Sequence, residues 1–279
     1  GTNYTLTKKD ALLKNGQVTL KFLPRIKHGD LQFGNGYAER AKLIGRYFRA
    51  EFASLKAEIE QPKYFREKLI YNYIYKGPLL EWYMRIKTSM EKNYKTFCEL
   101  VPQQGKILDI GCGYGFMAYM LSFTSAQRKI TGLDYDEEKI DTANNCFSKT
   151  NNINFVHGDV MGFEFEQYDA IIVADMLHYL PPAEQKQVIE KCISNLNPGG
   201  KLIIRDGDAD KEAMHKKTKL TEFFSTKLFN FNRTKETGLS FLSGTMIRNL
   251  AAEKNMDCSE MPDSKHTSNT LFILKARAN

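Results

Sequence analysis

The feature that most constrains this chain is a glycine-rich turn between an apolar strand and an apolar helix. Residues 107–115 read Ile-Leu-Asp-Ile-Gly-Cys-Gly-Tyr-Gly, and Asp134 follows 19 residues after the last glycine. Glycines let the backbone pass close to a ligand where a side chain would clash. The start of the following helix offers unpaired N–H groups to a polar or anionic group, and an acid about 20 residues further on suits a ribose diol. The pattern therefore predicts a site for a nucleoside-containing cofactor.

Strands and helices alternate from residue 105 onwards. The expected strands are 106–110, 130–134, 153–156, 169–174, 201–205 and 270–276, with a further one near 257–261, and the expected helices are 115–123, 136–149, 182–195 and 244–255. Such alternation predicts an α/β fold, with a mostly parallel sheet and helices on both of its faces. Residues 207–243 fit no regular element, and they carry a lysine cluster followed by five phenylalanines.

The order of the glycines distinguishes between cofactors. A dinucleotide fingerprint needs a third glycine or alanine, but counting from Gly111 places Phe116 there, and counting from Gly113 places Ala118 there. The observed order, D-x-G-x-G-x-G, instead resembles motif I of class I S-adenosylmethionine (SAM) methyltransferases. That family has a Rossmann-like seven-stranded sheet whose last strand is antiparallel.

Further segments resemble this family in the family's own order, over roughly residues 79–279. They are Ile130–Tyr135, Val156–Val160, Tyr168–Asp175 and Leu196–Leu202. The resemblance implies SAM as the cofactor, with Asp134 on the ribose, Tyr135 packed on the adenine, and Asp159 and Val160 at the adenine edge. The cofactor-binding residues that it implies are Asp109, Gly111, Cys112, Gly113, Gly115, Asp134, Tyr135, Asp159, Val160 and Asp175.

The sequence gives fewer signals for the acceptor-binding half of the site than for the cofactor-binding half. His178 is the best candidate for a catalytic base, because it lies just past the fourth strand, where strand ends face a ligand, and a histidine titrates near neutral pH. A histidine that only lines the cofactor pocket is the competing interpretation. Weaker candidates on the same rim are Asp175, Arg205, Asp206, His215 and Tyr179. No Pro-Cys nucleophile and no Asn-Pro-Pro motif of nucleobase enzymes occurs.

Composition narrows the class of protein. The five cysteines are far apart, without a C-x-x-C pair or a zinc-like Cys/His spacing, so we expect free thiols, a reducing compartment and no metal. No apolar run is long enough to span a bilayer, and no signal peptide is evident. Residues 1–100 hold 19 Lys and Arg against 10 Asp and Glu, whereas the rest is nearly neutral. We therefore expect a cytoplasmic protein without a nucleic-acid partner.

The first hundred residues suggest two additions to a methyltransferase domain at 102–279. Residues 1–60 combine an alternating strand, Gln17–Leu23, with a helix over 35–60, and they resemble the tail of a bacterial lysophospholipid acyltransferase without its H-x-x-x-x-D motif. The order of the two domains resembles a Bacteroidetes protein in which a lipid transporter, an acyltransferase and a methyltransferase are fused. Gly1 stands where a start methionine would, which suits a piece of a longer chain.

Residues 61–101 form a second, helical extension. Apolar residues from Leu79 to Val101 recur at spacings of three and four, which predicts one continuous helical stripe. The segment is also rich in aromatic and basic residues. One interpretation is that it packs on the edge of the methyltransferase domain and roofs its pocket. The other is that it rests on an anionic membrane surface, at the inner face of the membrane, and both can hold on different faces of the helices.

These features favour SAM-dependent methyl transfer to a small-molecule or lipid-like acceptor, at oxygen or carbon. The alternatives are a nicotinamide-dependent oxidoreductase, which the glycine order opposes, and a non-catalytic SAM-binding module beside a membrane domain. The acceptor atom and the oligomeric state cannot be read from these residues.

Overall fold

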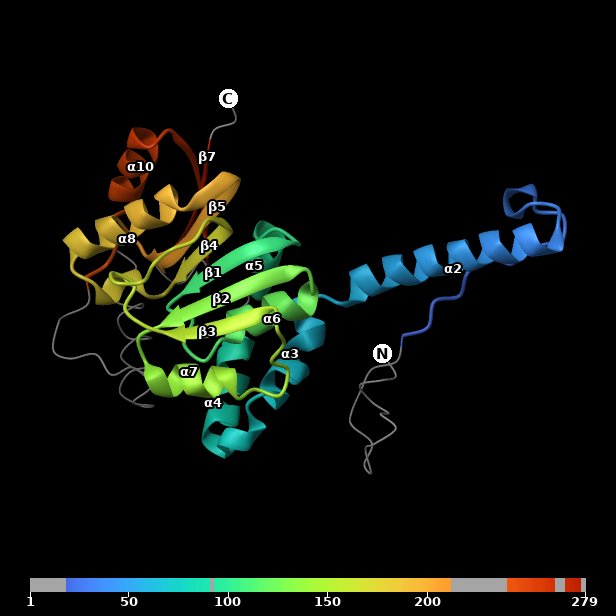
Figure 1. Ribbon diagram of the computed structural model, residues 1–279, viewed down its shortest axis with the longest axis horizontal. Helices are drawn as coiled ribbons and strands as arrows, with labels where there is room; N and C mark the ends of the chain where they lie inside the picture. The colour runs from blue at the N-terminus through green and yellow to red at the C-terminus, as the bar shows by residue number, and fades with distance from the viewer. Residues whose placement is uncertain (1–18, 91–92, 212–239, 264–268, 277–279) are drawn as a thin grey trace. The chain divides into compact units, whose positions relative to one another are not determined.

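The computed structural model describes residues 19–90, 93–211, 240–263 and 269–276 (Figure 1). The chain divides into two compact units, Gly1–Glu60 and Gln61–Asn279. None of the helices within the described ranges has both the length and the apolar character needed to cross a bilayer.

The described part of the first unit consists of a short 3₁₀ helix, η1 (Leu31–Phe33), and a long helix, α2 (Tyr37–Ile59). The helix expected over 35–60 is confirmed. The strand expected at Gln17–Leu23 is wrong where it can be examined, because residues 19–23 have no regular structure. A strand needs a neighbour to accept and donate its backbone hydrogen bonds, and the described residues offer these none.

The second unit is built on a seven-stranded sheet with the order β3-β2-β1-β4-β5-β7-β6. Its strands are β1 (Gly105–Ile110), β2 (Arg128–Asp134), β3 (Ile153–His157), β4 (Tyr168–Ala174), β5 (Leu196–Gly207), β6 (Met256–Pro262) and β7 (Asn269–Ala276). The pairs among β1–β5 are parallel, whereas β7 is antiparallel to both β5 and β6. This is the α/β, Rossmann-like arrangement that the sequence predicts.

Helices cover both faces of the sheet (Figure 1). They are α3 (Pro62–Tyr71), η2 (Ile74–Lys76), α4 (Pro78–Met90), α5 (Tyr94–Leu100), α6 (Phe116–Thr124), α7 (Glu137–Asn144), η3 (Leu177–Tyr179), α8 (Pro182–Ser194) and α10 (Gly244–Glu253). One core contains buried residues of α3–α7, and a second core on the other face contains those of α8 and α10. Helix α7 ends earlier than the expected 149, and β5 begins earlier than the expected 201.

The extension at residues 61–101 packs into the same unit as the sheet. Phe65, Leu69 and Phe97 are buried in one core with Phe116 and Tyr119 of α6. The single stripe expected from Leu79 to Val101 is wrong, because α4 ends at Met90 and α5 begins at Tyr94. Within α4 the buried face is also shifted, because Leu80 and Met84 are buried while Leu79 is 62% exposed. In the second half of the stripe, Tyr94, Phe97 and Val101 are buried as expected. The apolar side chains on opposite faces of α4 made its buried face ambiguous.

A buried arginine joins this extension to the sheet. Arg128 begins β2 and is fully buried. Its guanidinium donates to the carbonyls of Cys98, Val101 and Leu121, at the ends of α5 and α6, with N···O distances of 2.9–3.0 Å. The last carbonyls of a helix have no partner within the helix, so one side chain satisfies two helix ends, although burial lowers its pKa.

Candidate functional site

The glycine-rich turn lies at the carboxyl end of β1, beside the ends of β2 and β4. Its backbone is held at each step: the N–H groups of Gly111 and Cys112 donate to the Leu133 carbonyl, and the Gly115 N–H donates to the Cys112 carbonyl. The three glycines have φ values of 73°, 53° and 77°, in the left-handed region that glycine tolerates best. Helix α6 begins directly after the turn.

Two of the glycines have distinct steric roles. A Cβ on Gly115 would lie 2.4 Å from the Phe155 ring, so a side chain there would displace the core. A Cβ on Gly113 would meet its nearest neighbour, the Lys139 side chain, only at 4.0 Å. The space beside Gly113 is therefore open, and a ligand can approach the backbone there.

Asp134, which is predicted to bind the ribose, also forms hydrogen bonds that fix the glycine turn. Its Oδ2 accepts from the Gly113 N–H at 2.7 Å, and its Oδ1 accepts from the Asp136 N–H at 2.9 Å. The side chain is 9% exposed. A carboxylate has about four lone-pair positions, so both oxygens retain capacity for further donors such as ribose hydroxyls.

Asp109 is the most unusual acid of the site. It is 3% exposed, and its Oδ2 has no hydrogen-bond partner among the described residues. Burial, together with the neighbouring charge of Asp134, raises its pKa to about 7. A buried carboxylate oxygen without a donor suits a cationic ligand group, and the amino group of SAM is such a group. The residues present therefore fit this cofactor.

The remaining predicted cofactor residues lie at neighbouring strand ends. Tyr135 follows β2 and is 57% exposed, which leaves its ring accessible. Beyond β3, Asp159 is exposed and accepts from the Met161 N–H, while Val160 is buried. The Cys112 thiol packs where a Cβ on Gly132 would come within 2.8 Å, and burial raises its pKa. This favours a small residue at that position over a reactive one.

The structure places His178 in a buried pair with Asp206. His178 lies in η3, just past β4, and Asp206 lies near the end of β5. The His178 Nδ1 and an Asp206 carboxylate oxygen are 2.7 Å apart, and the other oxygen accepts from the His178 N–H at 3.2 Å. The side chains are 2% and 1% exposed. An acid in this position fixes the orientation and the tautomer of the imidazole.

Arg205 and Asp175 form a second network on the same rim. The guanidinium of Arg205 forms two ion pairs, one with Asp175 and one with Asp263. The N···O distance to Asp263 is 2.8 Å. Asp175, predicted to bind cofactor, has a φ of 53°, a conformation that strains a side-chain-bearing residue.

The two remaining candidates on this rim are Tyr179 and His215. Tyr179 packs against His178, with ring centroids 4.1 Å apart. His215 lies outside the described residues.

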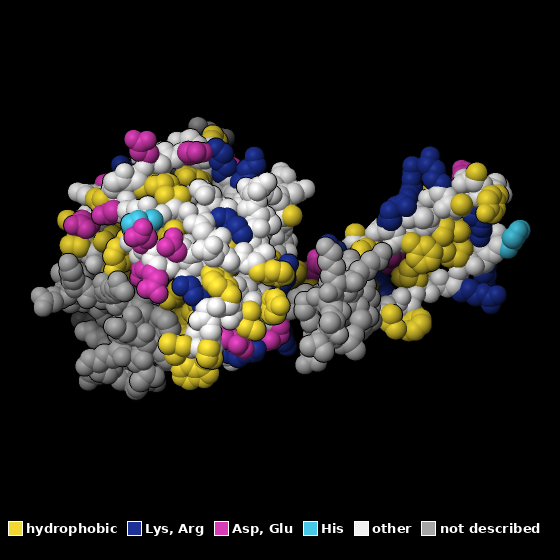
Figure 2. All heavy atoms as spheres, turned by 60° about the horizontal axis from the view of Figure 1, so that its bottom comes forward, with side chains coloured by type: hydrophobic (Ala, Val, Ile, Leu, Met, Phe, Trp, Pro, Cys, Tyr) yellow, Lys and Arg dark blue, Asp and Glu magenta, His cyan; other side chains and the backbone are white. Residues whose placement is uncertain are grey.

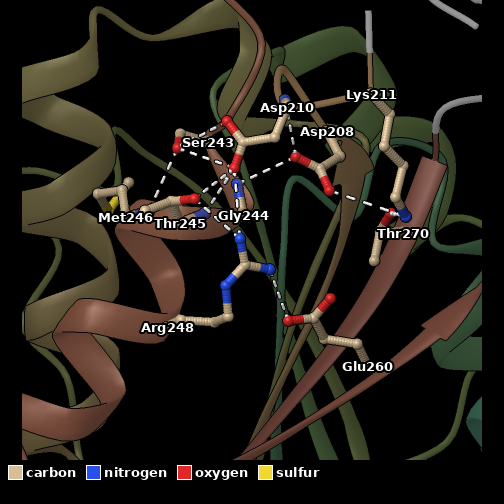
Figure 3. Close-up of polar contacts among 10 residues, drawn as sticks. All are labelled: Asp208, Asp210, Lys211, Ser243, Gly244, Thr245, Met246, Arg248, Glu260 and Thr270. Carbon is tan, nitrogen blue, oxygen red and sulfur yellow. Dashed lines mark hydrogen bonds and ion pairs between the residues drawn. The ribbon is translucent and has the colours of Figure 1, made fainter. Parts of the chain in front are cut away.

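A polar cluster around the start of α10 was not expected from the sequence (Figure 3). The N–H groups of Gly244, Thr245 and Met246 donate to Asp208, Asp210 and Ser243, respectively, at 2.8–3.2 Å. Only Ser243 is adjacent to the helix in sequence, so only that cap was visible as a local signal. The cluster brings residues 208–211 and 240–246 together beside His178, whose carbonyl accepts from the Ser240 N–H.

Comparison with known proteins agrees with this geometry. Residues 107–200 match a sequence family described as "Methyltransferase domain". A carboxy-S-adenosyl-L-methionine synthase of Campylobacter fetus is 28% identical over 102 residues, 36% of this chain and 44% of that protein. A ubiquinone biosynthesis O-methyltransferase of Shewanella halifaxensis is 32% identical over 99 residues, 34% of this chain and 40% of that protein. The chain spans about half or less of the curated relatives it matches.

Solved structures share the fold. An O-methyltransferase family protein of Burkholderia thailandensis superposes with a TM-score of 0.54 at 16% identity, covering 77% of this chain and 59% of that one. Human N-acetylserotonin methyltransferase, solved with SAM, gives 0.52 at 18% identity, covering 74% and 58%. Residues 107–200 thus resemble methyltransferases in sequence, and the chain shares its fold with solved methyltransferases.

Proposed function

We propose that the protein transfers the methyl group of SAM to a small-molecule or lipid-like acceptor, at oxygen or carbon. The observation that carries the proposal is the combination of an open glycine turn with the buried oxygen of Asp109 beside it, which has no hydrogen-bond partner in the described part of the chain. The named relatives and the methyltransferase-domain match support the same activity. The order of the glycines and this match weigh against a nicotinamide-dependent oxidoreductase.

In this proposal, the ends of β1–β3 bind the cofactor. Asp109 faces the amino group, the first N–H groups of α6 face the carboxylate, Asp134 holds the ribose, and Tyr135 packs on the adenine. Further along the chain, Asp159 and Val160 flank the adenine edge. SAM supplies an activated methyl group, so the protein chiefly has to orient the acceptor and exclude water.

His178 is the proposed base. Because the Asp206 carboxylate engages Nδ1, Nε2 is the nitrogen that would accept a proton from an acceptor hydroxyl or carbon acid. Asp206 would then stabilise the imidazolium. General-base help of this kind contributes about 100- to 10,000-fold in rate.

Binding and turnover test the proposal separately. We expect calorimetry to show micromolar binding of SAM and of its demethylated product, with strong loss on Asp134→Ala and little change on Asp141→Ala, an exposed acid on α7. In an acceptor screen that measures the demethylated product, His178→Gln should reduce turnover at least 100-fold while SAM binding persists. No binding by the unmodified protein would refute the proposal, and binding without turnover on any acceptor would favour the non-catalytic module.

A second candidate comes from the names of the relatives. Several curated relatives, including the one from Campylobacter fetus, are named carboxy-S-adenosyl-L-methionine synthase. In such a reaction SAM would be a substrate, and its carboxylated form would be the product. Mass spectrometry of the cofactor after incubation with candidate carboxylated metabolites would detect a heavier SAM species, which methyl transfer does not produce.

The lipid-like acceptor is supported by an apolar surface on the second unit. Figure 2 shows hydrophobic side chains gathered on the surface of the second unit. Its members, all at least 38% exposed, are Tyr71, Ile74, Tyr75, Leu79, Trp82 and Phe147. We propose that this surface, with the exposed Lys76 beside it, meets the cytoplasmic face of an anionic membrane. Flotation with anionic vesicles should fall on the double change Leu79→Ser and Trp82→Ser; unchanged flotation would contradict contact.

We also propose that residues 1–60 are the tail of an acyltransferase domain, and that residues 61–101 extend the methyltransferase domain at 102–279. The first part is supported by the apolar side chains of α2, among which Phe48 and Phe52 are 51% and 65% exposed. Such side chains suit a helix that packs against a further domain.

A further inference from the structure

One side chain from outside the methyltransferase segment reaches the cofactor turn. The hydroxyl of Tyr73 donates to the carbonyl of Tyr114, between the second and third glycines, at an O···O distance of 2.7 Å. Tyr73 lies between α3 and η2, 41 positions earlier in the chain. Tyr114 lies in the turn between β1 and α6, so its carbonyl is outside the backbone hydrogen bonds of the sheet.

Tyr73 is held rigidly where it makes this contact. It is fully buried, and its ring packs edge-on against Phe116, with centroids 4.9 Å apart and an interplanar angle of 85°. A second edge-on contact joins it to Tyr119. Phe116 and Tyr119 form the first turns of α6, so the same side chain contacts both the turn and the helix that follows.

We propose that Tyr73 is a positioning residue for the cofactor: it fixes the peptide between Tyr114 and Gly115, and with it the first N–H groups of α6. The other fixed points of the turn come from β2, through the Leu133 carbonyl and Asp134. Tyr73 supplies a fixed point from the N-terminal extension. The inference rests on the proposed SAM binding, and it makes Tyr73, which precedes the predicted methyltransferase domain at 102–279, part of the machinery that holds the cofactor.

The chain contains its own control. Tyr75, two residues further on, donates to the Thr142 carbonyl at the same distance, 2.7 Å. Tyr119 donates to the Ala143 carbonyl, also at 2.7 Å. All three hydroxyls bind a backbone carbonyl, but only that of Tyr73 reaches the glycine turn, whereas the other two reach the end of α7. Removal of each hydroxyl therefore separates general stability from cofactor placement.

The experiment compares Tyr73→Phe with Tyr75→Phe, which both keep the ring and lose one hydrogen bond. We expect Tyr73→Phe to weaken binding of SAM and of its demethylated product about tenfold, the upper range for a single hydrogen bond. Tyr75→Phe should bind both as the unmodified protein does. Tyr119→Phe, which like Tyr73→Phe removes a hydroxyl from a fully buried ring, should keep full affinity with a similar change in melting temperature. Equal affinity in the two variants would overturn the inference while leaving SAM binding intact. Failure of the unmodified protein to bind SAM would overturn the proposed function and this inference together.

Hydrogen exchange of the unmodified protein keeps the test informative if Tyr73→Phe does not fold. Addition of SAM should slow exchange of backbone amides in residues 70–74 as well as in residues 111–116. Protection confined to residues 111–116 would contradict a positioning role for Tyr73.

Discussion

At the scale of single residues, two carboxylates share the end of the parallel sheet and have different environments. Asp134 accepts two backbone N–H groups, whereas Asp109, on the neighbouring strand β1, has an oxygen that no described group satisfies. Hydrogen bonds stabilise a charged carboxylate, and burial without them does the opposite. The pair is therefore arranged so that backbone donors satisfy one acid and the other is left to a ligand.

The pKa of about 7 at Asp109 predicts pH-dependent cofactor binding. A cationic amino group favours the ionised acid, so affinity for SAM should rise as pH increases through 7, by about tenfold between pH 6 and pH 8. Calorimetry across this range measures it. Asp109→Asn is the control, because the amino group of the ligand titrates in both cases; a pH profile that the two proteins share would contradict the prediction.

The same raised pKa has a consequence for the empty protein. Between about pH 4 and pH 7 the folded state binds a proton at Asp109 that the unfolded state has released. The free energy of unfolding should therefore fall as pH rises through this interval, and added SAM should offset the loss.

At the scale of elements, α10 begins with three of its N–H groups capped by side chains from two separate segments (Figure 3). Asp210 contributes most, because its carboxylate also accepts from the hydroxyls of Ser243 and Thr245 and pairs with Arg248. Acids are favoured at helix starts for this reason. The cap ties the end of β5 to the helix and to the segment next to His178.

Asp210→Ala should lower the free energy of unfolding by about 1 kcal/mol, measured by urea denaturation at neutral pH. Hydrogen bonds from Thr245 lower the pKa of Asp210, so its contribution is present above the ordinary aspartate pKa and is lost as pH falls through the lowered value. Glu253→Ala, at the exposed far end of α10, is the matched control. Equal losses in the two variants would contradict a capping role.

At the scale of the whole molecule, the second unit has no internal boundary at residue 101. Helices α3 and α5 bury Phe65, Leu69 and Phe97 against α6, and Arg128 joins the carbonyl ends of α5 and α6. Removal of residues before 102 would expose this core and leave a buried cation without two of its acceptors.

We therefore expect a chain of residues 61–279 to unfold in one cooperative calorimetric transition with the SAM affinity of the full chain. A chain of residues 102–279 should aggregate or show no cooperative transition. A shorter chain that melts at the same temperature as residues 61–279 would show that the extension is dispensable for folding.

Much of the fold could be predicted from the residues because its signals are local. Strand ends, the glycine turn and the acid after β2 each follow from short patterns, and all seven strands lie where alternation of apolar segments placed them, within a few residues. The buried face of α4 could not be predicted in this way, because Leu79 and Leu80 are equally apolar and only the packing of α4 against α3 and η2 selects Leu80.

The candidate site also has features that the sequence predicts and features that only the tertiary structure shows. The turn at Gly111–Gly115 and the position of Asp134 follow from spacing along the chain, since parallel strands bring their carboxyl ends to one edge. The pairing of His178 with Asp206, the contact of Tyr73 with Tyr114 and the capping of α10 by Asp208 and Asp210 join residues 28 to 41 positions apart. Local patterns determine which elements form, whereas the close packing of those elements decides which distant polar groups must satisfy one another.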